Sequence, residues 1–215
     1  MVKLSIIIPA YNEEEYIEST LLAIKNSGFQ DVETIVVCNG CTDKTAIKAR
    51  KYASKVIEYA QKGVSFARNQ GAKEATGDKL IFLDADIIID ADVLKGIANS
   101  EYDIGVTFTK PNLDKFIAKT LMKLKNIIVP FTKTSTGLIF CNKKIFEKIK
   151  FSEGMDKHED RKFIGDVSRI GKFGVARVYV TNNMRRFEKK GYLNVCLYWI
   201  KDFFVSDKKE YEAVR

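Results

Sequence analysis

The sequence contains a single histidine and four cysteines, and this scarcity limits the metal chemistry open to it. Cys38 and Cys41 form one C-x-x-C pair, but no second pair follows and His158 stands alone, which disfavours a structural zinc site or a redox pair. We expect Cys38 to be a core residue at a strand end and Cys41 to be a small loop residue. Free thiols favour a reducing compartment, so we expect a cytoplasmic protein.

Long apolar runs and familiar nucleotide loops are also missing. No apolar run approaches about 18 residues, so no membrane-spanning helix is expected. The N-terminus has one lysine and no cleavage site, so it is not expected to be a signal peptide. No G-x-G-x-x-G follows the first predicted strand and no Walker lysine is present, which disfavours a dinucleotide dehydrogenase and a P-loop enzyme. We find no internal repeat.

The length and charge set broader bounds. A chain of 215 residues predicts one domain, or one domain with a small appendage. Its 46% hydrophobic and 30% charged residues are typical of a globular protein. The formal net charge of +8 favours an anionic partner, for which a phosphate-rich substrate, an anionic membrane surface and nucleic acid all qualify.

Strand and helix patterns alternate through the first 86 residues. Continuous apolar runs predict buried strands at residues 4–8, 32–37, 55–59 and 80–83, and helical periodicity predicts helices at residues 17–24, 42–53 and 63–75. This alternation implies a Rossmann-like α/β fold, a mostly parallel sheet with helices on both faces. Ligands bind beyond the carboxyl ends of such strands, so we expect residues 9–12, 39–40 and 84–86 on one rim.

The pair Asp84 and Asp86 directly follows the strand predicted at residues 80–83. With spacing i, i+2 the two carboxylates share a side. Such hard oxygen ligands suit Mg²⁺ or Mn²⁺, and this ion in turn suits a diphosphate. The structural alternative is a turn after a strand, where aspartate is common.

The second half is less regular. Helices are predicted at residues 92–99, 112–129 and 156–170, and strands at residues 104–109, 137–141 and 173–180. Within one domain we expect a nucleotide-binding half at 1–100, a smaller mixed acceptor-side half at 101–190, and a C-terminal helix and tail at 191–215. The aromatic helix predicted at 192–205 is expected to pack on the core, a partner or a membrane interface.

The segment 112–129 has two contrasting faces as a helix. Its apolar face, expected to join the core, holds Ile117, Leu121, Leu124 and Ile128. The opposite face, expected to be solvated, holds Lys115, Lys119 and Lys123. The alternative is a surface helix whose lysines touch anionic lipid heads.

Six segments, in order, resemble the motifs of family 2 glycosyltransferases with the GT-A fold. They are residues 5–14 (SIIIPAYNEE), 36–45 (VVCNGCTDKT), 63–78 (GVSFARNQGAKEATGD), 84–86 (DAD), 158–160 (HED) and 185–188 (RRFE). The resemblance runs from about residue 3 to 190. It implies an inverting hexosyltransferase that moves a sugar from a nucleoside diphosphate to an acceptor hydroxyl, with Mg²⁺ or Mn²⁺ as cofactor.

The resemblance also implies roles for single residues. Asp86 would hold the metal, with Asp84 near the ribose or the ion, and Asp160 would be the catalytic base, with Glu159 as second choice. The alternative for the acidic pair is an exposed first turn of a helix. His158 is expected to be a surface or supporting residue rather than a third metal ligand. The expected contacts to the nucleotide-sugar are Pro9, Ala10, Tyr11, Glu13, Asn39, Arg68, Asp84, Asp86 and Arg185.

Some of these contacts have stated functions. Tyr11 would lie against the base, and Arg68 and Arg185 would neutralise the diphosphate, although a solvated arginine pair at 185–186 is the alternative. Family members usually carry aspartate where this chain has Cys38 and Asn39. The amide oxygen of Asn39 can still accept from uracil N3–H, so a UDP-sugar is expected while base selectivity stays open.

Two other functions, a nucleotidyltransferase and a nucleic-acid-binding module, fit the sequence less well. A nucleotidyltransferase would need a Gly-rich, basic loop after the first strand, and this chain has three consecutive glutamates there. A nucleic-acid-binding module would gather its basic residues on one element, and here they are spread along the chain. We therefore expect a glycan or lipid-linked acceptor and no nucleic acid, with peripheral contact at the inner face of an anionic membrane as an open alternative.

Overall fold

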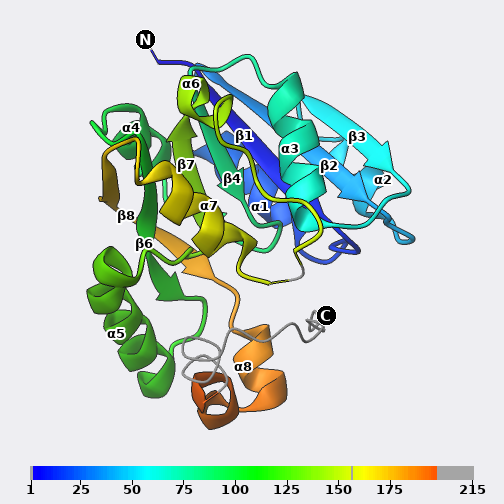
Figure 1. Cartoon of the computed structure of the whole chain (residues 1–215). Helices are drawn as coiled ribbons and strands as arrows, with labels where there is room; N and C mark the ends of the chain where they lie inside the picture. Colours follow the sequence, from blue (N-terminus) through cyan, green and yellow to red (C-terminus); the bar gives the residue numbers. More distant parts are fainter. Residues whose placement is uncertain (1, 156, 198–215) are drawn as a thin grey trace.

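The computed structural model of the chain describes residues 2–155 and 157–197, which form an eight-stranded sheet between two helical layers (Figure 1). The sheet order is β3-β2-β1-β4-β7-β6-β8-β5. The strands are β1 (Leu4–Ala10), β2 (Val32–Asn39), β3 (Lys55–Tyr59), β4 (Lys79–Leu83), β5 (Ile88–Ile89), β6 (Ile104–Pro111), β7 (Leu138–Asn142) and β8 (Phe173–Asn182). The helices are α1 (Ile17–Asn26), α2 (Thr45–Ala49), α3 (Val64–Glu74), α4 (Val93–Ala98), α5 (Phe116–Thr132), α6 (Lys143–Phe146), α7 (Glu159–Val167) and α8 (Arg185–Lys190).

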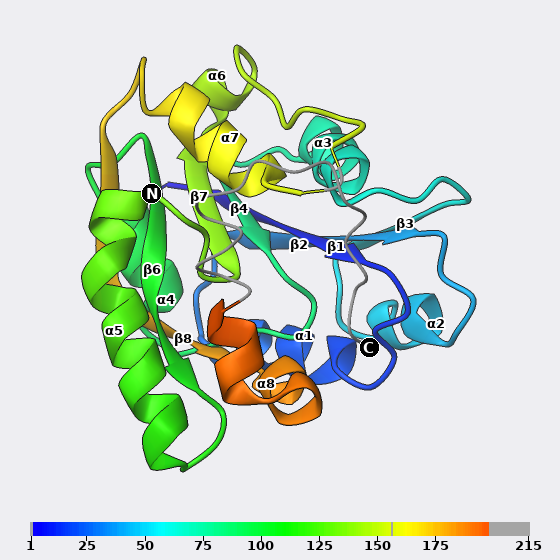
Figure 2. The same cartoon turned by 60° about the horizontal axis from the view of Figure 1, so that its bottom comes forward.

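The two faces of the sheet are covered by different helices. α1, α2 and α4 pack on one face, and α3, α6 and α7 pack on the other, as Figure 2 shows with the two groups on opposite sides of the strands. Strands β1 and β4 are almost wholly buried, because both of their faces meet a helical layer. The predicted α/β class, a mostly parallel sheet with helices on both sides, is confirmed.

The parallel part of the sheet positions the rim. β1 pairs in parallel with β2 and with β4, and β2 pairs in parallel with β3. In this register Ala10 lies beside Cys38, and Cys38 beside Glu58. The loops that follow β1, β2 and β4 therefore leave the sheet at the same edge. β7 runs antiparallel between β4 and β6, and β5 runs antiparallel to β8 at the sheet edge.

Helix α5 corrects one prediction. Its buried residues are Ala118, Met122 and Val129, whereas three members of the predicted core face, Ile117, Leu124 and Ile128, are 52%, 54% and 45% exposed. The buried side meets α8 and Val195, where Met184 and Phe187 close a small separate cluster. The helix is also fixed on its other partner, β6, where the Asn126 amide bonds both backbone groups of Thr109 at 2.9 Å, and Val129 joins the main core.

Short elements account for the other differences. The helix predicted to reach residue 53 ends at Ala49, and β5, α6 and α8 carry too few residues for a periodic signal. Of the C-terminal helix predicted at 192–205, residues 192–197 are helical and the remainder lies outside the described residues.

Candidate functional site

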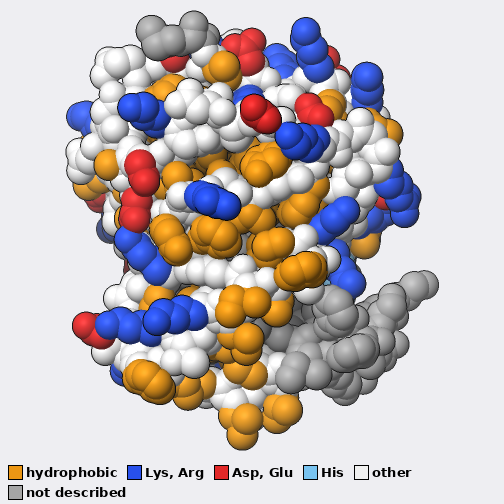
Figure 3. Space-filling model, turned by 90° about the vertical axis from the view of Figure 1, so that its left-hand side faces the viewer, with side chains coloured by type: hydrophobic (Ala, Val, Ile, Leu, Met, Phe, Trp, Pro, Cys, Tyr) orange, Lys and Arg blue, Asp and Glu red, His pale blue; other side chains and the backbone are white. Residues whose placement is uncertain are grey.

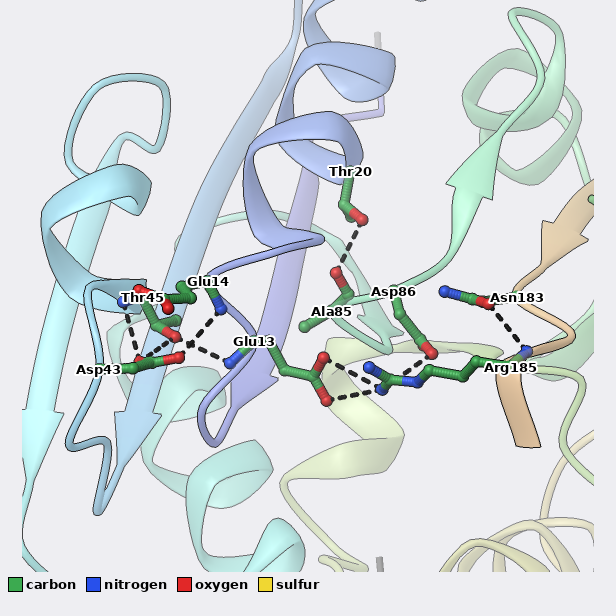
Figure 4. Close-up of polar contacts among 9 residues, drawn as sticks. All are labelled: Glu13, Glu14, Thr20, Asp43, Thr45, Ala85, Asp86, Asn183 and Arg185. Atoms are coloured by element: carbon green, nitrogen blue, oxygen red, sulfur yellow. Dashed lines mark hydrogen bonds and ion pairs between the residues drawn. The ribbon is translucent and has the colours of Figure 1, made fainter. Parts of the chain in front are cut away.

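The turn of residues 84–86 joins β4 to β5 at the rim. Two contacts fix it: the backbone N–H of Asp84 donates to the carbonyl of Gly137 at 3.0 Å, and the buried hydroxyl of Thr20 donates to the carbonyl of Ala85 at 2.8 Å (Figure 4). Gly137 adopts a φ of +93°, a backbone conformation that favours glycine. The turn is thus held from α1 on one side and from the start of β7 on the other.

One buried arginine joins the two acidic segments. Arg68 on α3 is 5% exposed, and its Nη2 lies 3.2 Å from Asp84 Oδ1 while its Nη1 lies 3.0 Å from Glu159 Oε1. Burial alone would lower the pKa of Arg68, but the charges of Asp84, Glu159 and Asp160 raise it. The guanidinium therefore stays charged and brings the D-x-D turn and the start of α7 into one site.

A second arginine closes the opposite side of the turn. Arg185, at the start of α8, donates through Nη2 to both carboxylate oxygens of Glu13 at 2.9 and 3.0 Å, and lies 3.1 Å from Asp86 Oδ2 (Figure 4). Its guanidinium stacks over the ring of Tyr16, with its carbon 4.4 Å from the ring centroid. Three segments far apart in sequence thus meet at one guanidinium group.

The electrostatics of the turn suit a cation. Burial, reinforced by the charges of Asp84 and Glu13, raises the pKa of Asp86 to about 6 in spite of Arg185. Burial also raises the pKa of Asp84, although Arg68 opposes it, and 43% of the Asp84 side chain remains exposed. Two carboxylates close to each other, each with a raised pKa, gain from a positive charge beside them.

The donor set fits a metal that shares its ligands with a substrate. Among residues 2–155 and 157–197, no group of three or more His, Cys, Asp or Glu side chains could hold an ion by itself. Mg²⁺ is commonly held by one or two carboxylates together with substrate phosphates and water. Asp84 and Asp86 match that arrangement.

The first turn of α7 separates the two candidate bases. Burial raises the pKa of Glu159, with Arg68 opposing and Asp160 adding to the rise, and the Glu159 carboxylate is held by the Arg68 ion pair. Asp160, the next residue, is half-buried and accepts the backbone N–H of Arg161 at 2.6 Å through Oδ1. Because the Glu159 carboxylate is ion-paired with Arg68, Asp160 is the better candidate for proton transfer.

At the end of β2, the buried side chain of Asn39 bonds two backbone groups of neighbouring segments. Asn39 is 5% exposed, and in the amide orientation that satisfies both groups its nitrogen donates to Ala10 O at 2.8 Å and its oxygen accepts from Gly63 N at 3.2 Å. The amide thus ties three loops together. Base recognition by Asn39 stays a prediction that depends on the second lone pair of its oxygen.

Neighbouring loops are fixed in the same way. Glu13 N–H donates to Thr45 Oγ1 at 2.8 Å and Glu14 N–H donates to Asp43 Oδ2 at 3.1 Å, so the loop after β1 is tied to the start of α2 (Figure 4). Half-buried Tyr11 lies in this loop, with Lys62 Nζ 4.8 Å from its ring centroid. Pro9 stands one residue before the end of β1, opposite Val37.

The histidine and cysteines lie near the rim. His158 immediately precedes α7 with a φ of +59° and is half-buried. Cys38 is buried at the end of β2 and Cys41 lies in the next loop, where its Sγ donates to Ala10 O at 3.2 Å. Both cysteines are free, which confirms their predicted positions.

Lys125 on α5 is the residue that the sequence reasoning missed. Burial lowers its pKa to about 8, while the charges of Asp160 and Asp84 act in the opposite direction. The available signal was a second helical stripe, in which Lys125 stands among Ala118, Met122 and Val129. A lysine within a buried stripe is costly unless it has charged partners.

Comparison with known proteins gives a consistent result. The model of the family described as Glycosyl transferase family 2 matches residues 5–164. The minor teichoic acid biosynthesis protein GgaB of Bacillus subtilis is 29% identical over 201 residues, which cover 80% of this chain and 22% of that protein. The chain spans less than half the length of the curated relatives that it matches.

Two solved structures share the fold. S. aureus TarS 1–349 in complex with UDP-GlcNAc has a TM-score of 0.69 at 23% identity, covering 84% of this chain and 58% of that one. The mannosyltransferase PcManGT of Pyrobaculum calidifontis, in complex with GDP-Man and Mn²⁺, has a TM-score of 0.70 at 16% identity, covering 97% and 66%. With a family model matching most of the chain and a GT-A fold over nearly all of it, the protein belongs to glycosyltransferase family 2.

Proposed function

We propose that the protein is a metal-dependent, inverting hexosyltransferase that uses a nucleoside diphosphate sugar, with UDP as the preferred nucleotide. One observation carries the proposal. Arg68 is ion-paired with Asp84 and with Glu159 at the same time, so the D-x-D turn and the first turn of α7, where Asp160 follows Glu159, belong to a single site.

The reaction places a clear demand on Asp160. An acceptor hydroxyl is a poor nucleophile, so a carboxylate must take its proton as the oxygen attacks the anomeric carbon. The new carbon–oxygen bond forms as the bond to the diphosphate breaks on the opposite side, which inverts the configuration. Asp160 receives the proton, and Arg68 keeps the neighbouring Glu159 from competing for that position.

The leaving diphosphate requires positive charge. A divalent ion at Asp84 and Asp86 would act as a Lewis acid on the diphosphate oxygens. Arg185 lies 3.1 Å from Asp86 Oδ2 and is held by Glu13, so its guanidinium is already positioned beside the place where that charge develops. Mg²⁺ and Mn²⁺ suit the two carboxylates equally well.

The proposal of UDP as the nucleotide is supported by Tyr11 and Asn39 at the rim and by the similar fold of TarS. TarS binds UDP-GlcNAc, whereas PcManGT binds GDP-Man. Tyr11 would pack against the base, with the backbone of Pro9 and Ala10 as a wall and Asn39 beside it. Because the Asn39 amide already bonds two backbone groups, its selectivity for uracil over guanine depends on a single remaining lone pair.

Calorimetry of UDP binding tests the proposal. We expect the wild type to bind UDP with Mn²⁺ or Mg²⁺, to bind it at least about tenfold more weakly in EDTA, and Asp86→Ala to lose the metal-dependent part, because the ion then has one carboxylate instead of two. The control is Asp92→Ala, an exposed aspartate at the start of α4. Metal-dependent binding of GDP but not UDP would reassign the donor, and failure to bind any nucleoside diphosphate would refute the proposal.

Lys125 is expected to contribute to the rate. Lys125→Met keeps the length of the side chain and removes the charge that interacts with Asp84 and Asp160. We expect kcat/KM for sugar transfer to fall roughly tenfold or more, since preorganised charge is lost from a site with little water. The measurement is nucleotide release with donor and acceptor, beside Lys95→Met, an exposed lysine of α4. Equal activity of the two variants would remove Lys125 from the site.

The acceptor is proposed to be a glycan or a lipid-linked molecule, at a cytoplasmic site with peripheral contact to the membrane. Among the described residues, no helix has the length and apolar content needed to cross a bilayer. The support for membrane contact comes instead from the surface of α5.

A further inference from the structure

Helix α5 leaves a broad apolar surface uncovered. Phe116 and Phe131, near its two ends, are 86% and 83% exposed, and Ile127 between them is 66% exposed. Ile117, Leu124 and Ile128 add exposed area on the same helix. Figure 3, which views the side that carries α5 in Figure 1, shows hydrophobic side chains gathered over the lower half of this face. Isolated exposed apolar residues are ordinary, but a contiguous set of this kind marks a binding surface.

The spacing of these residues makes them one surface. At 3.6 residues per turn each step turns the helix by about 100°, which places all six side chains within an arc of about 120°. The buried residues Ala118, Met122 and Val129 lie outside this arc, on the side that meets the rest of the protein. We call the six residues the outer face of α5.

The charges beside the outer face are mostly positive, although Asp114, just before the helix, forms an ion pair with Lys119. Residues 115–133 contain five lysines and no aspartate or glutamate. Lys119 and Lys123 follow the outer face along one flank, within about 60° of Phe116 on the helical wheel. An apolar face with aromatic side chains and lysines on its flank is the composition of helices that lie in the interface of anionic bilayers.

We propose that the outer face of α5 docks on an anionic lipid surface, with Phe116, Ile127 and Phe131 entering the acyl boundary and Lys119 and Lys123 meeting the headgroups. The sequence left two alternatives for this segment, a core helix with a solvated lysine face and a surface helix that touches anionic lipid heads, and the exposed apolar residues favour the second. The excess of lysines also disfavours a second copy of the chain, because two α5 helices face to face would bring together more lysines than acids.

Docking of α5 on a lipid surface would bring the candidate site close to that surface. The charges of Asp84 and Asp160 act on Lys125, and Asn126 beside it bonds the backbone of Thr109 on β6, so the helix that carries the outer face also packs beside the site. A lipid-linked acceptor would then reach Asp160 along α5 without leaving the bilayer surface. This last step rests on the proposed function; the docking itself does not.

Vesicle binding tests the inference on the full chain. We expect the wild type to co-sediment with vesicles of equal parts phosphatidylglycerol and phosphatidylcholine at low salt, and much less with phosphatidylcholine alone. The double variant Phe116→Glu, Phe131→Glu should bind the anionic vesicles at least about tenfold more weakly, because it loses two of the largest apolar contacts. Both side chains are almost fully exposed, so folding should be unaffected.

A matched control separates apolar contact from net charge. Ile47→Glu, Ile170→Glu changes the charge by the same amount at two exposed apolar residues outside α5 and should bind like the wild type. Equal losses in both double variants, unchanged binding in both, or no wild-type binding would overturn the docking. UDP binding is measured on the same samples. A protein that binds the vesicles but fails to bind UDP or any other nucleoside diphosphate would refute the proposed function and leave the docking supported.

Discussion

Replacing Asp160 with asparagine should leave UDP binding close to that of the wild type and reduce the turnover of sugar transfer by about 10²- to 10⁴-fold, the usual contribution of a general base. Asparagine keeps the shape of the side chain and removes the ability to take the acceptor proton. The measurement is nucleotide release with the donor and acceptor that give the highest wild-type rate, together with calorimetry of UDP binding.

Two further variants on α7 make this result specific. Asp166→Asn changes an aspartate of the same helix that pairs with Lys162 and Arg169, and it should retain its turnover. Glu159→Gln weakens the Arg68 ion pair and should reduce stability more than rate. If Glu159→Gln lost turnover by the larger factor while Asp160→Asn stayed active, the roles assigned to the two carboxylates would be reversed.

Replacing Arg68 with methionine should produce the largest loss of stability of any substitution at the site. The arginine side chain is 6% exposed and neutralises Asp84 and Glu159 together. Removing one partner of a buried pair typically costs about 3–5 kcal/mol, because a desolvated charge is left behind. For a chain of this size each kcal/mol moves Tm by about 2–4 °C, so we expect a fall of about 10 °C in a thermal melt.

The pH dependence identifies the cause of that loss. The pKa values of Asp84 and Glu159 are already raised in the folded protein. Without Arg68 they rise further, so the folded state takes up protons before the unfolded state does, and the penalty is present above the folded pKa and lost as pH falls through it. The Tm difference from the wild type should therefore shrink between pH 8 and pH 5. A difference that does not change with pH would indicate lost packing instead.

Arg50→Met is the matched control for this variant. Arg50 forms an ion pair with Glu58 at the surface, where both side chains are more than half exposed. Exposed ion pairs contribute little to stability because solvent screens them. Its melting temperature should match that of the wild type at every pH.

Much of the rim could be predicted from the sequence because the first strands are local and continuous. β3 has the predicted bounds, and β1, β2 and β4 differ from theirs by one or two residues at an end. Once the strands are parallel, their carboxyl ends must share one edge, so Pro9, Asn39 and Asp84 follow from the pattern without knowledge of any side-chain contact.

The orientation of α5 could not be predicted in the same way. Periodicity shows that a helix has an apolar face, but α5 has two candidate faces, and only the packing partner decides which is buried. The partners of α5 are β6, where Asn126 bonds the backbone of Thr109, and a segment some sixty residues later in the chain that supplies Met184 and Phe187. Lys125 was missed for the same reason, since its partners Asp84 and Asp160 lie on other elements.

The ion pair between Glu13 and Arg185 has a consequence for the order of folding during synthesis. The two residues are separated by 172 positions, so the first carboxylate leaves the ribosome long before its arginine exists. The parallel strands β1 to β4 can assemble during synthesis, whereas contacts across such a separation form late because a long loop must be closed. We therefore expect the nascent chain to fold the sheet of β1 to β4 first and to complete the site only after residue 185 has been synthesised.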